Sequence, residues 1–138
     1  MDLRFFSDRS LGDHIVPQAL RAAGWSVVSM RERYGPVSAQ QLSDIDWIRD
    51  ATAEGEVLLT GDKAVAKRPL EALAVITTGA RVFALGNNQL SGRQKADRLL
   101  QHGSAIARRA MSRPGPYVVA VTGRGLETIV MNQDGLQR

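Results

Sequence analysis

The sequence predicts an α/β fold with three layers, in which helices cover both faces of a central, mainly parallel sheet. Short apolar segments typical of buried strands alternate with segments of helical periodicity along most of the chain. The length of 138 residues, 43% of them hydrophobic, is about one domain's worth and suffices to close a core. We therefore expect a single domain over residues 1–138.

The first third of the chain contains two predicted strands and one helix. Leu3–Ser7 is short, apolar and aromatic, which predicts a strand. A helix is expected over Pro17–Ala23, because proline favours the first helical turn, and the second strand over Trp25–Met30. Residues 31–42 are predicted to be a loop, since Gly35 and the proline after it are a turn signal.

The middle of the chain continues the alternation. Ser43 with Asp46 three residues later resembles a capping box and begins a helix. The next strand, Glu56–Thr60, has three consecutive apolar residues, which favours burial of both of its faces. A helix over Pro69–Ile76 and a fourth strand over Arg81–Leu85 follow.

The last third begins with the longest predicted helix. Ser91 with Gln94 is a second capping box, and apolar residues recur every three or four positions as far as Ala110. Tyr117–Val121 and Thr128–Met131 are expected to pair as a C-terminal β-hairpin.

Charge is divided unevenly along the chain. Residues 1–62 hold six Lys and Arg against ten Asp and Glu, and residues 63–138 hold twelve against four, so balances of −4 and +8 give the net +4. An acidic first half and a basic second half suit a site that collects cations and meets a polyanion, although ordinary surface charge would look the same.

Several functional classes are excluded. The absence of cysteine rules out disulfides, thiolate metal sites and cysteine nucleophiles. No phosphate-binding loop or dinucleotide fingerprint is present, and His14 and His102 are isolated from any triad pattern. Without a secretory signal or an apolar run above five residues, the sequence predicts a cytoplasmic protein with no membrane span.

Three acids are expected to meet at the carboxyl edge of the sheet, where ligands bind in such folds. Asp8 ends the first strand, Asp62 follows the third, and Asp44 opens the helix that leads into the third. Converging carboxylates repel one another unless a hard divalent ion such as Mg²⁺ neutralises them. Glu32 and Asp46 are candidates for outer positions. The alternative for each acid is a turn or a helix cap, and for Asp46 capping is explanation enough.

Three segments together resemble PIN-like domains: FFSDRSLG at residues 5–12, SDIDWI at 43–48 and VLLTGDK at 57–63. The likeness is greatest to the compact toxins of the VapC family of type II toxin–antitoxin pairs, and it covers residues 3–112. It implies a three-layer PIN-like fold and a metal-dependent endoribonuclease that uses Mg²⁺ or Mn²⁺. It also implies an RNA substrate, an antitoxin protein as partner, and a homodimer or hetero-oligomer.

The resemblance also implies roles for individual residues. Asp8, Asp44 and Asp62 match the metal-binding and catalytic acids, and Thr60 matches a hydroxyl that orients them. The family usually has one more glutamate between the first and third acids, for which Glu32 is the best-placed substitute, and Val65 stands where an aromatic residue is common. These departures leave a non-catalytic module that binds RNA or protein as an alternative function.

Basic residues are the candidates for RNA contacts. Arg9 and Lys63 lie beside two of the acids and are expected to bind the scissile phosphate, with Lys67 and Arg68 close behind. The cations of the last predicted helix are either a solvated face or a phosphate track. A receiver-like phosphoacceptor domain also places acids after strands one and three, but it needs a lysine after the fifth strand, where Thr122 begins Thr-Gly-Arg.

Overall fold

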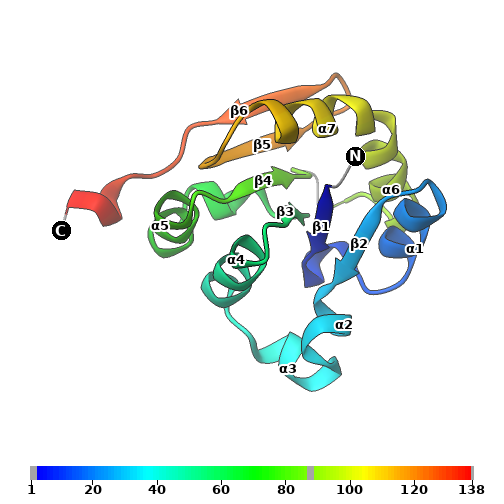
Figure 1. Cartoon of the computed structure of the whole chain (residues 1–138), viewed down its shortest axis with the longest axis horizontal. Helices are drawn as coiled ribbons and strands as arrows, with labels where there is room; N and C mark the ends of the chain where they lie inside the picture. Colours follow the sequence, from blue (N-terminus) through cyan, green and yellow to red (C-terminus); the bar gives the residue numbers. More distant parts are fainter. Residues whose placement is uncertain (1–2, 87–88, 138) are drawn as a thin grey trace.

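Six strands form one sheet in the order β2-β1-β3-β4-β5-β6 (Figure 1). The computed structural model describes residues 3–86 and 89–137. Neighbouring strands run parallel from β2 to β5, and β6 pairs antiparallel with β5, so the predicted α/β class and the C-terminal hairpin are confirmed. The strands are β1 (Arg4–Ser7), β2 (Ser26–Ser29), β3 (Val57–Thr60), β4 (Arg81–Ala84), β5 (Tyr117–Val121) and β6 (Leu126–Ile129).

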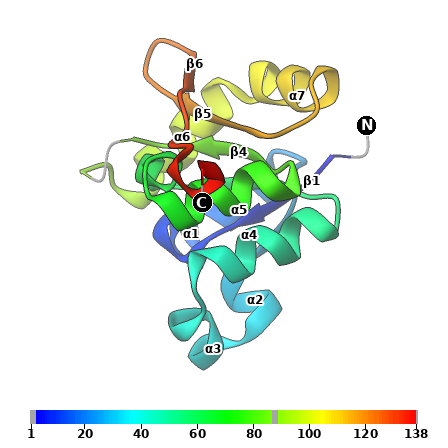
Figure 2. The same ribbon diagram turned by 90° about the vertical axis from the view of Figure 1, so that its left-hand side faces the viewer.

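Helices cover both faces of this sheet (Figures 1 and 2). One face carries α1 (Ile15–Ala22), α6 (Gly92–Gln101) and α7 (Gly103–Ser112). The other carries α2 (Met30–Tyr34), α3 (Pro36–Gln41), α4 (Asp44–Ala53) and α5 (Pro69–Thr78). Short 3₁₀ helices η1 (Arg9–Leu11) and η2 (Lys63–Ala66) follow β1 and β3, and η3 (Asp134–Gln137) packs near α5. None of the described helices has the length and apolar character needed to cross a bilayer.

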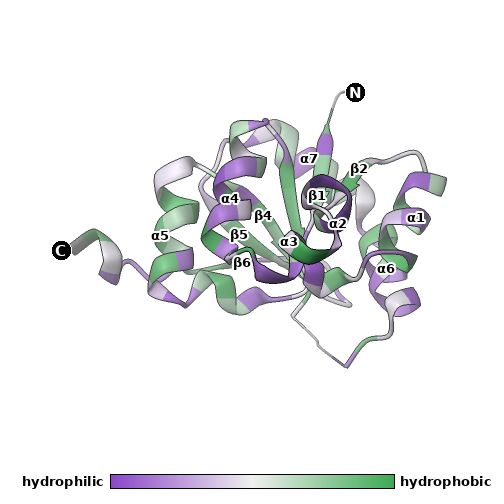
Figure 3. Ribbon diagram, turned by 90° about the horizontal axis from the view of Figure 1, so that it is seen from below, coloured by the Kyte–Doolittle hydropathy of each residue, from purple (hydrophilic) through white to green (hydrophobic). Residues whose placement is uncertain are grey.

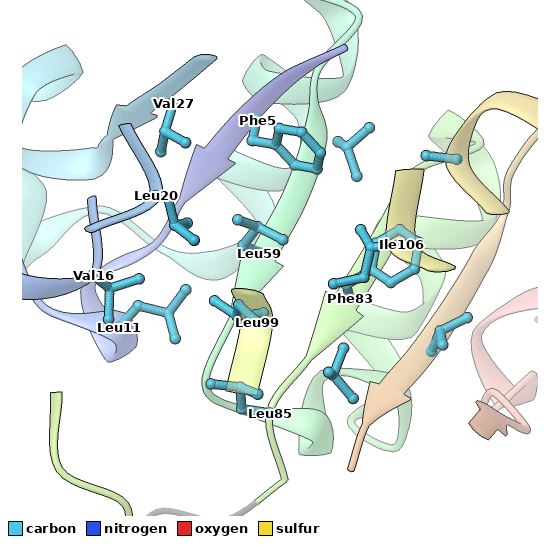
Figure 4. Close-up of a cluster of buried hydrophobic side chains, with 14 of the residues drawn as sticks. Phe5, Leu11, Val16, Leu20, Val27, Leu59, Phe83, Leu85, Leu99 and Ile106 are labelled. Carbon is cyan, nitrogen blue, oxygen red and sulfur yellow. The ribbon is translucent and has the colours of Figure 1, made fainter. Parts of the chain in front are cut away.

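Successive strand residues divide between two cores because side chains alternate across a sheet. Phe5, Leu59 and Phe83 point towards α1, α6 and α7, and Figure 4 shows them packed with Leu20 and Ile106. Their chain neighbours, such as Phe6 and Leu58, point the other way and pack with Trp47 and Ile48 of α4. In Figure 3 hydrophobic residues (green) follow the central strands, whereas hydrophobic and hydrophilic residues (green and purple) alternate along the helices.

The predicted loop over residues 31–42 is wrong, because two short helices occupy it. Ser29 and Glu32 form a complete capping box that begins α2, and Pro36 opens α3. Gly35 joins the two helices with φ +86°, a conformation that favours glycine. The glycine and proline that predict a turn therefore mark a one-residue connection between α2 and α3.

The long helix predicted from Ser91 is also wrong, since α6 and α7 replace it. The capping box of Ser91 and Gln94 is present at its start, but the first helix ends at Gln101. At the break, a Cβ on Gly103 would lie 3.0 Å from the ring of Trp25, so close packing on that indole needs a glycine. Strand β6 begins two residues earlier than predicted, because Thr122 closes a tight turn with Gly125.

Candidate active site at the carboxyl edge of the sheet

Three acids lie on or beside the edge where β1 and β3 end. Asp8 follows β1 directly and caps η1, Asp62 caps η2 two residues after β3, and Asp44 is the first residue of α4. The Asp8 amide donates to the carbonyl of Leu59 over 3.1 Å, so the pairing of β1 with β3 continues as far as the first acid. The topology therefore brings separate segments of the chain to one edge.

Asp8 is buried in a network of hydroxyl groups. Its Oδ2 accepts a hydrogen bond from Thr60 Oγ1 at 2.7 Å, and its Oδ1 accepts from both the amide and the hydroxyl of Ser10. The Ser10 hydroxyl in turn accepts from the Gly61 amide at 2.7 Å. A Cβ on Gly61 would lie 3.2 Å from the Ser10 carbonyl oxygen, so the loops after β1 and β3 approach this closely because residue 61 is a glycine.

Burial dominates the electrostatics of Asp8, whose side chain and backbone are only 4% exposed. Desolvation raises the pKa of Asp8 to about 6, although its bonds to Ser10 and Thr60 lower it, and the negative charge of Asp44 raises it further. A positive charge placed beside Asp8 would favour its ionised form.

Arg68 supplies a positive charge to the other two acids. Its Nη2 lies 2.8 Å from Asp62 Oδ2, and its Nη1 lies 3.8 Å from Asp44 Oδ2. The remaining oxygen of each acid is held locally, since Asp62 Oδ1 accepts from the Ala64 amide and Asp44 Oδ1 from the Trp47 indole. Arg68 thus joins two acids that lie 18 positions apart in the sequence, at 44 and 62.

The chemistry of these donors suits a hard divalent cation, since Asp8, Asp44 and Asp62 offer only carboxylate oxygens. Across residues 3–86 and 89–137, no group of three or more such side chains is already gathered closely enough to hold an ion. The counter-charge of Asp44 and Asp62 is instead the Arg68 guanidinium. The three side chains therefore have the ligand chemistry that the cation requires. In this structure the positive charge between Asp44 and Asp62 is that of Arg68.

The two outer candidates have other partners. The Glu32 carboxylate accepts from the Ser29 amide in the capping box and forms an ion pair with Arg21, which lowers its pKa. Asp46 accepts a hydrogen bond from the Ser43 hydroxyl at the start of α4, as the capping interpretation predicts. Both carboxylates thus have local roles at helix starts.

The basic residues near the acids are tied into the fold to different degrees. Arg9 donates to the carbonyls of Gln40 and Leu42, which fastens the segment that leads to Asp44. Lys67 Nζ donates to the carbonyl of Val130 at 2.6 Å. The Lys63 side chain is exposed, and its amine has no hydrogen bond or ion pair within the described ranges.

Sequence reasoning missed two supporting side chains. Ser10 binds Asp8 and Gly61, and Lys95 of α6 donates to the Ser10 carbonyl at 3.0 Å. The position of Ser10, two residues after an acid that ends a strand, is a signal of an Asx turn that could have identified it. No local signal connects Lys95 with a residue 85 positions earlier.

The pKa of Asp8 predicts a pH dependence of stability. Because the folded pKa of about 6 exceeds the ordinary value of 3.8, the folded state binds this proton more tightly than the unfolded state does. Protonation of Asp8 therefore adds to the free energy of unfolding. This stabilisation is fully present below pH ~4, is lost as pH rises through ~6, and amounts to about 2–3 kcal/mol in total. Urea unfolding in EDTA at several pH values should show this fall for the wild type and not for Asp8→Asn. Identical pH profiles of the two proteins would contradict the assignment.

Comparison with known proteins identifies the family of the chain. The model of a family described as "PIN like domain" matches residues 3–87. The chain is 39% identical over 116 residues to a curated protein of Mycobacterium tuberculosis named "Putative ribonuclease VapC45", a match that covers 84% of this chain and 83% of that protein. No solved structure gives a significant match. The receiver-like alternative finds no support among these relatives.

Proposed function

The chain belongs to the PIN-like family, and from this premise we propose that it is a metal-dependent endoribonuclease, the toxin of a type II toxin–antitoxin pair. It would hydrolyse RNA phosphodiesters to products with 5′-phosphate and 3′-hydroxyl ends. The observation that carries the proposal is that two side chains link the three acid positions in pairs. The Thr60 hydroxyl binds the Asp8 carboxylate and the Asp62 amide, and the Arg68 guanidinium lies beside the carboxylates of Asp44 and Asp62. The name of the 39% identical relative supports the choice of RNA as substrate.

In this proposal Asp8, Asp44 and Asp62 hold Mg²⁺ or Mn²⁺. The ion, when bound, supplies a Lewis acid for the phosphate and lowers the pKa of a water molecule. Thr60 orients the site from behind, because its hydroxyl donates to Asp8 and accepts from the Asp62 amide at 3.1 Å. Ser10 does the same for the other oxygen of Asp8.

The cations of this edge bind the substrate. Lys63, directly after Asp62, presents an exposed amine to the scissile phosphate. Arg68, also exposed, and Arg9, whose guanidinium keeps donors beyond the two carbonyls that it serves, add positive charge on either side of the acids. Neither histidine is assigned as a base here, since within the described residues neither the His14 nor the His102 side chain forms a hydrogen bond or ion pair with the three acids.

The test is cleavage of single-stranded RNA followed by analysis of the product ends. EDTA should stop cleavage, and Mg²⁺ or Mn²⁺ should restore it. The new ends should be 5′-phosphate and 3′-hydroxyl, and a 2′-deoxy nucleotide at the cut should remain cleavable, because the RNA's own 2′-hydroxyl is not the nucleophile. Products with 2′,3′-cyclic phosphate formed in EDTA would refute this mechanism.

One observation favours the alternative of a non-catalytic PIN-like module that binds RNA or protein. The substitute for the family glutamate, Glu32, is engaged by Arg21 and Ser29. Such a module would bind RNA and leave it intact at every concentration of Mg²⁺ or Mn²⁺, so the same assay separates the two functions.

A further inference from the structure

A groove of about 650 Å³ opens between η2 and the C-terminal hairpin. Lys63 and Lys67 line one side, the ends of β5 and β6 line the other, and Arg98 reaches in from α6. Its volume lies within the range of roughly 300–1,000 Å³ that is typical of ligand sites. The groove is distinct from the acids, none of which lines it.

The groove begins where the acid site ends. Lys63 is the residue after Asp62, and its stem passes so close to Gly86 that a Cβ there would lie 2.8 Å from Lys63 Cδ. Gly86 thus leaves room for the lysine at the boundary between acids and groove. A chain whose phosphate lies at Lys63 would have its next unit in the groove.

Most of the charged side chains that line the groove are positive, and most of them have no partner in the part of the chain that the structure describes. Among the described residues that line it, three cations, Lys63, Lys67 and Arg98, face a single acid, Glu127 of β6. Within the described ranges neither the Arg98 guanidinium nor the Glu127 carboxylate has an ion pair or a hydrogen bond. The Lys67 amine uses only one of its three donors, on the Val130 carbonyl. The apolar residues of the hairpin wall, Ile129 and the exposed Val130, provide a surface for an unpaired base.

Half of this groove lies beyond the part of the chain that the family model matches. That match ends at residue 87, whereas Arg98 and both hairpin strands come later. The Arg98 guanidinium lies beside the hairpin turn, because a Cβ on Gly123 would stand about 3.5 Å from its Nη2. The second wall and its cation are therefore additions to the matched core.

We propose that this groove binds one unpaired nucleotide of single-stranded RNA, next to the phosphate that is cut, with Lys63 and Arg98 on its flanking phosphates. The inference rests on the proposed function for the choice of RNA. Binding would be largely independent of base identity, since none of the described residues that line the groove is aromatic and could stack on a base.

The experiment measures binding of a fluorescent single-stranded RNA of mixed sequence in EDTA, by polarisation, over a range of salt concentrations. Arg98→Gln should raise Kd by roughly fivefold and reduce the salt slope by about 0.7, the value for one phosphate contact on a single strand. Glu127→Gln should lower Kd by about twofold or more, because Glu127 is the only acid among the described residues that line the groove. A gain of affinity cannot result from misfolding.

The matched control is Arg113→Gln, which removes the same charge at the opposite edge, where β5 begins, and should change Kd by less than about twofold. Equal effects of the two arginine variants, or an unchanged Kd for Glu127→Gln, would overturn the inference and leave a peptide as the candidate occupant. Wild-type protein that binds no RNA would also overturn it. Groove-dependent binding without cleavage would overturn the nuclease proposal alone, whereas cleavage with unchanged binding in both groove variants would overturn the groove alone.

Discussion

Expression of the wild-type chain should arrest the growth of a bacterial host, and Asp62→Ala should relieve the arrest. Asp62 is proposed as a cation ligand, and its carboxylate also pairs with Arg68 at 2.8 Å. Loss of a supporting residue at a metal site costs about 10–100-fold in activity or affinity, so loss of a ligand should cost roughly 100-fold or more in RNA cleavage. Growth curves at matched expression and cleavage by the purified proteins measure both effects.

The control for this experiment is Asp97→Ala. Asp97 is an exposed acid of α6 whose partner is Arg93 on the same helix, so its removal changes the charge equally and should leave the arrest intact. Co-expression of the cognate antitoxin should protect cells that carry the wild-type chain. If the wild type and Asp62→Ala are equally harmless at matched expression, the toxin proposal fails, while a role in slow RNA processing would remain open to the cleavage assay.

Replacement of Arg33 by alanine should be the most destabilising change at a charged residue. Both guanidinium Nη atoms of Arg33 bind the Glu56 carboxylate at 2.6 Å, and Glu56 is only 5% exposed. Arg33→Ala would leave that carboxylate buried without a partner, at a cost of roughly 3–5 kcal/mol in the free energy of unfolding. The guanidinium also lies over the ring of Phe6, 5.1 Å from its centre, so packing is lost as well.

Urea unfolding at pH 7 measures this loss of free energy of unfolding. Two further variants of the chain test whether the buried charge of Glu56 is its cause. The double variant Arg33→Ala/Glu56→Ala should lose less than the sum of the single variants, because no unpaired charge remains. Arg93→Ala, which breaks an exposed pair, should change the free energy of unfolding by at most about 1 kcal/mol. A similar loss in Arg33→Ala and Arg93→Ala would show that burial of Glu56 is not the cause.

The strands and the three acids could be predicted from the sequence because the information is local. Three consecutive apolar residues before Thr60 indicate a strand with two buried faces, and an acid after such a strand lies at the carboxyl edge whatever the other contacts are. The short helices α2 and α3 could not be predicted in the same way. Their two faces are not periodic enough over five or six residues, and only the Ser29–Glu32 capping box marks the first.

Contacts between distant parts of the chain explain the other failures. Gly103 is interpreted from the sequence as a tolerated glycine within a helix, and its close approach to the Trp25 ring, at the start of α7, depends on a residue 78 positions earlier. Likewise, Arg68 is recognisable as a cation near Asp62, but its second partner, Asp44, depends on how α4 lies against η2 and α5. A single sequence records the spacing of residues along the chain and not these distances across it.

The hydrogen bond from Thr60 to Asp8 can form only after the ribosome has added residue 60. The two residues are 52 positions apart, and β1 lies between β2 and β3 in the sheet. While the ribosome is still adding the residues of β3, Asp8 lacks both the Leu59 carbonyl and the Thr60 hydroxyl that hold it. A nascent chain released before this point contains Asp8 and Asp44 and still has no assembled acidic edge.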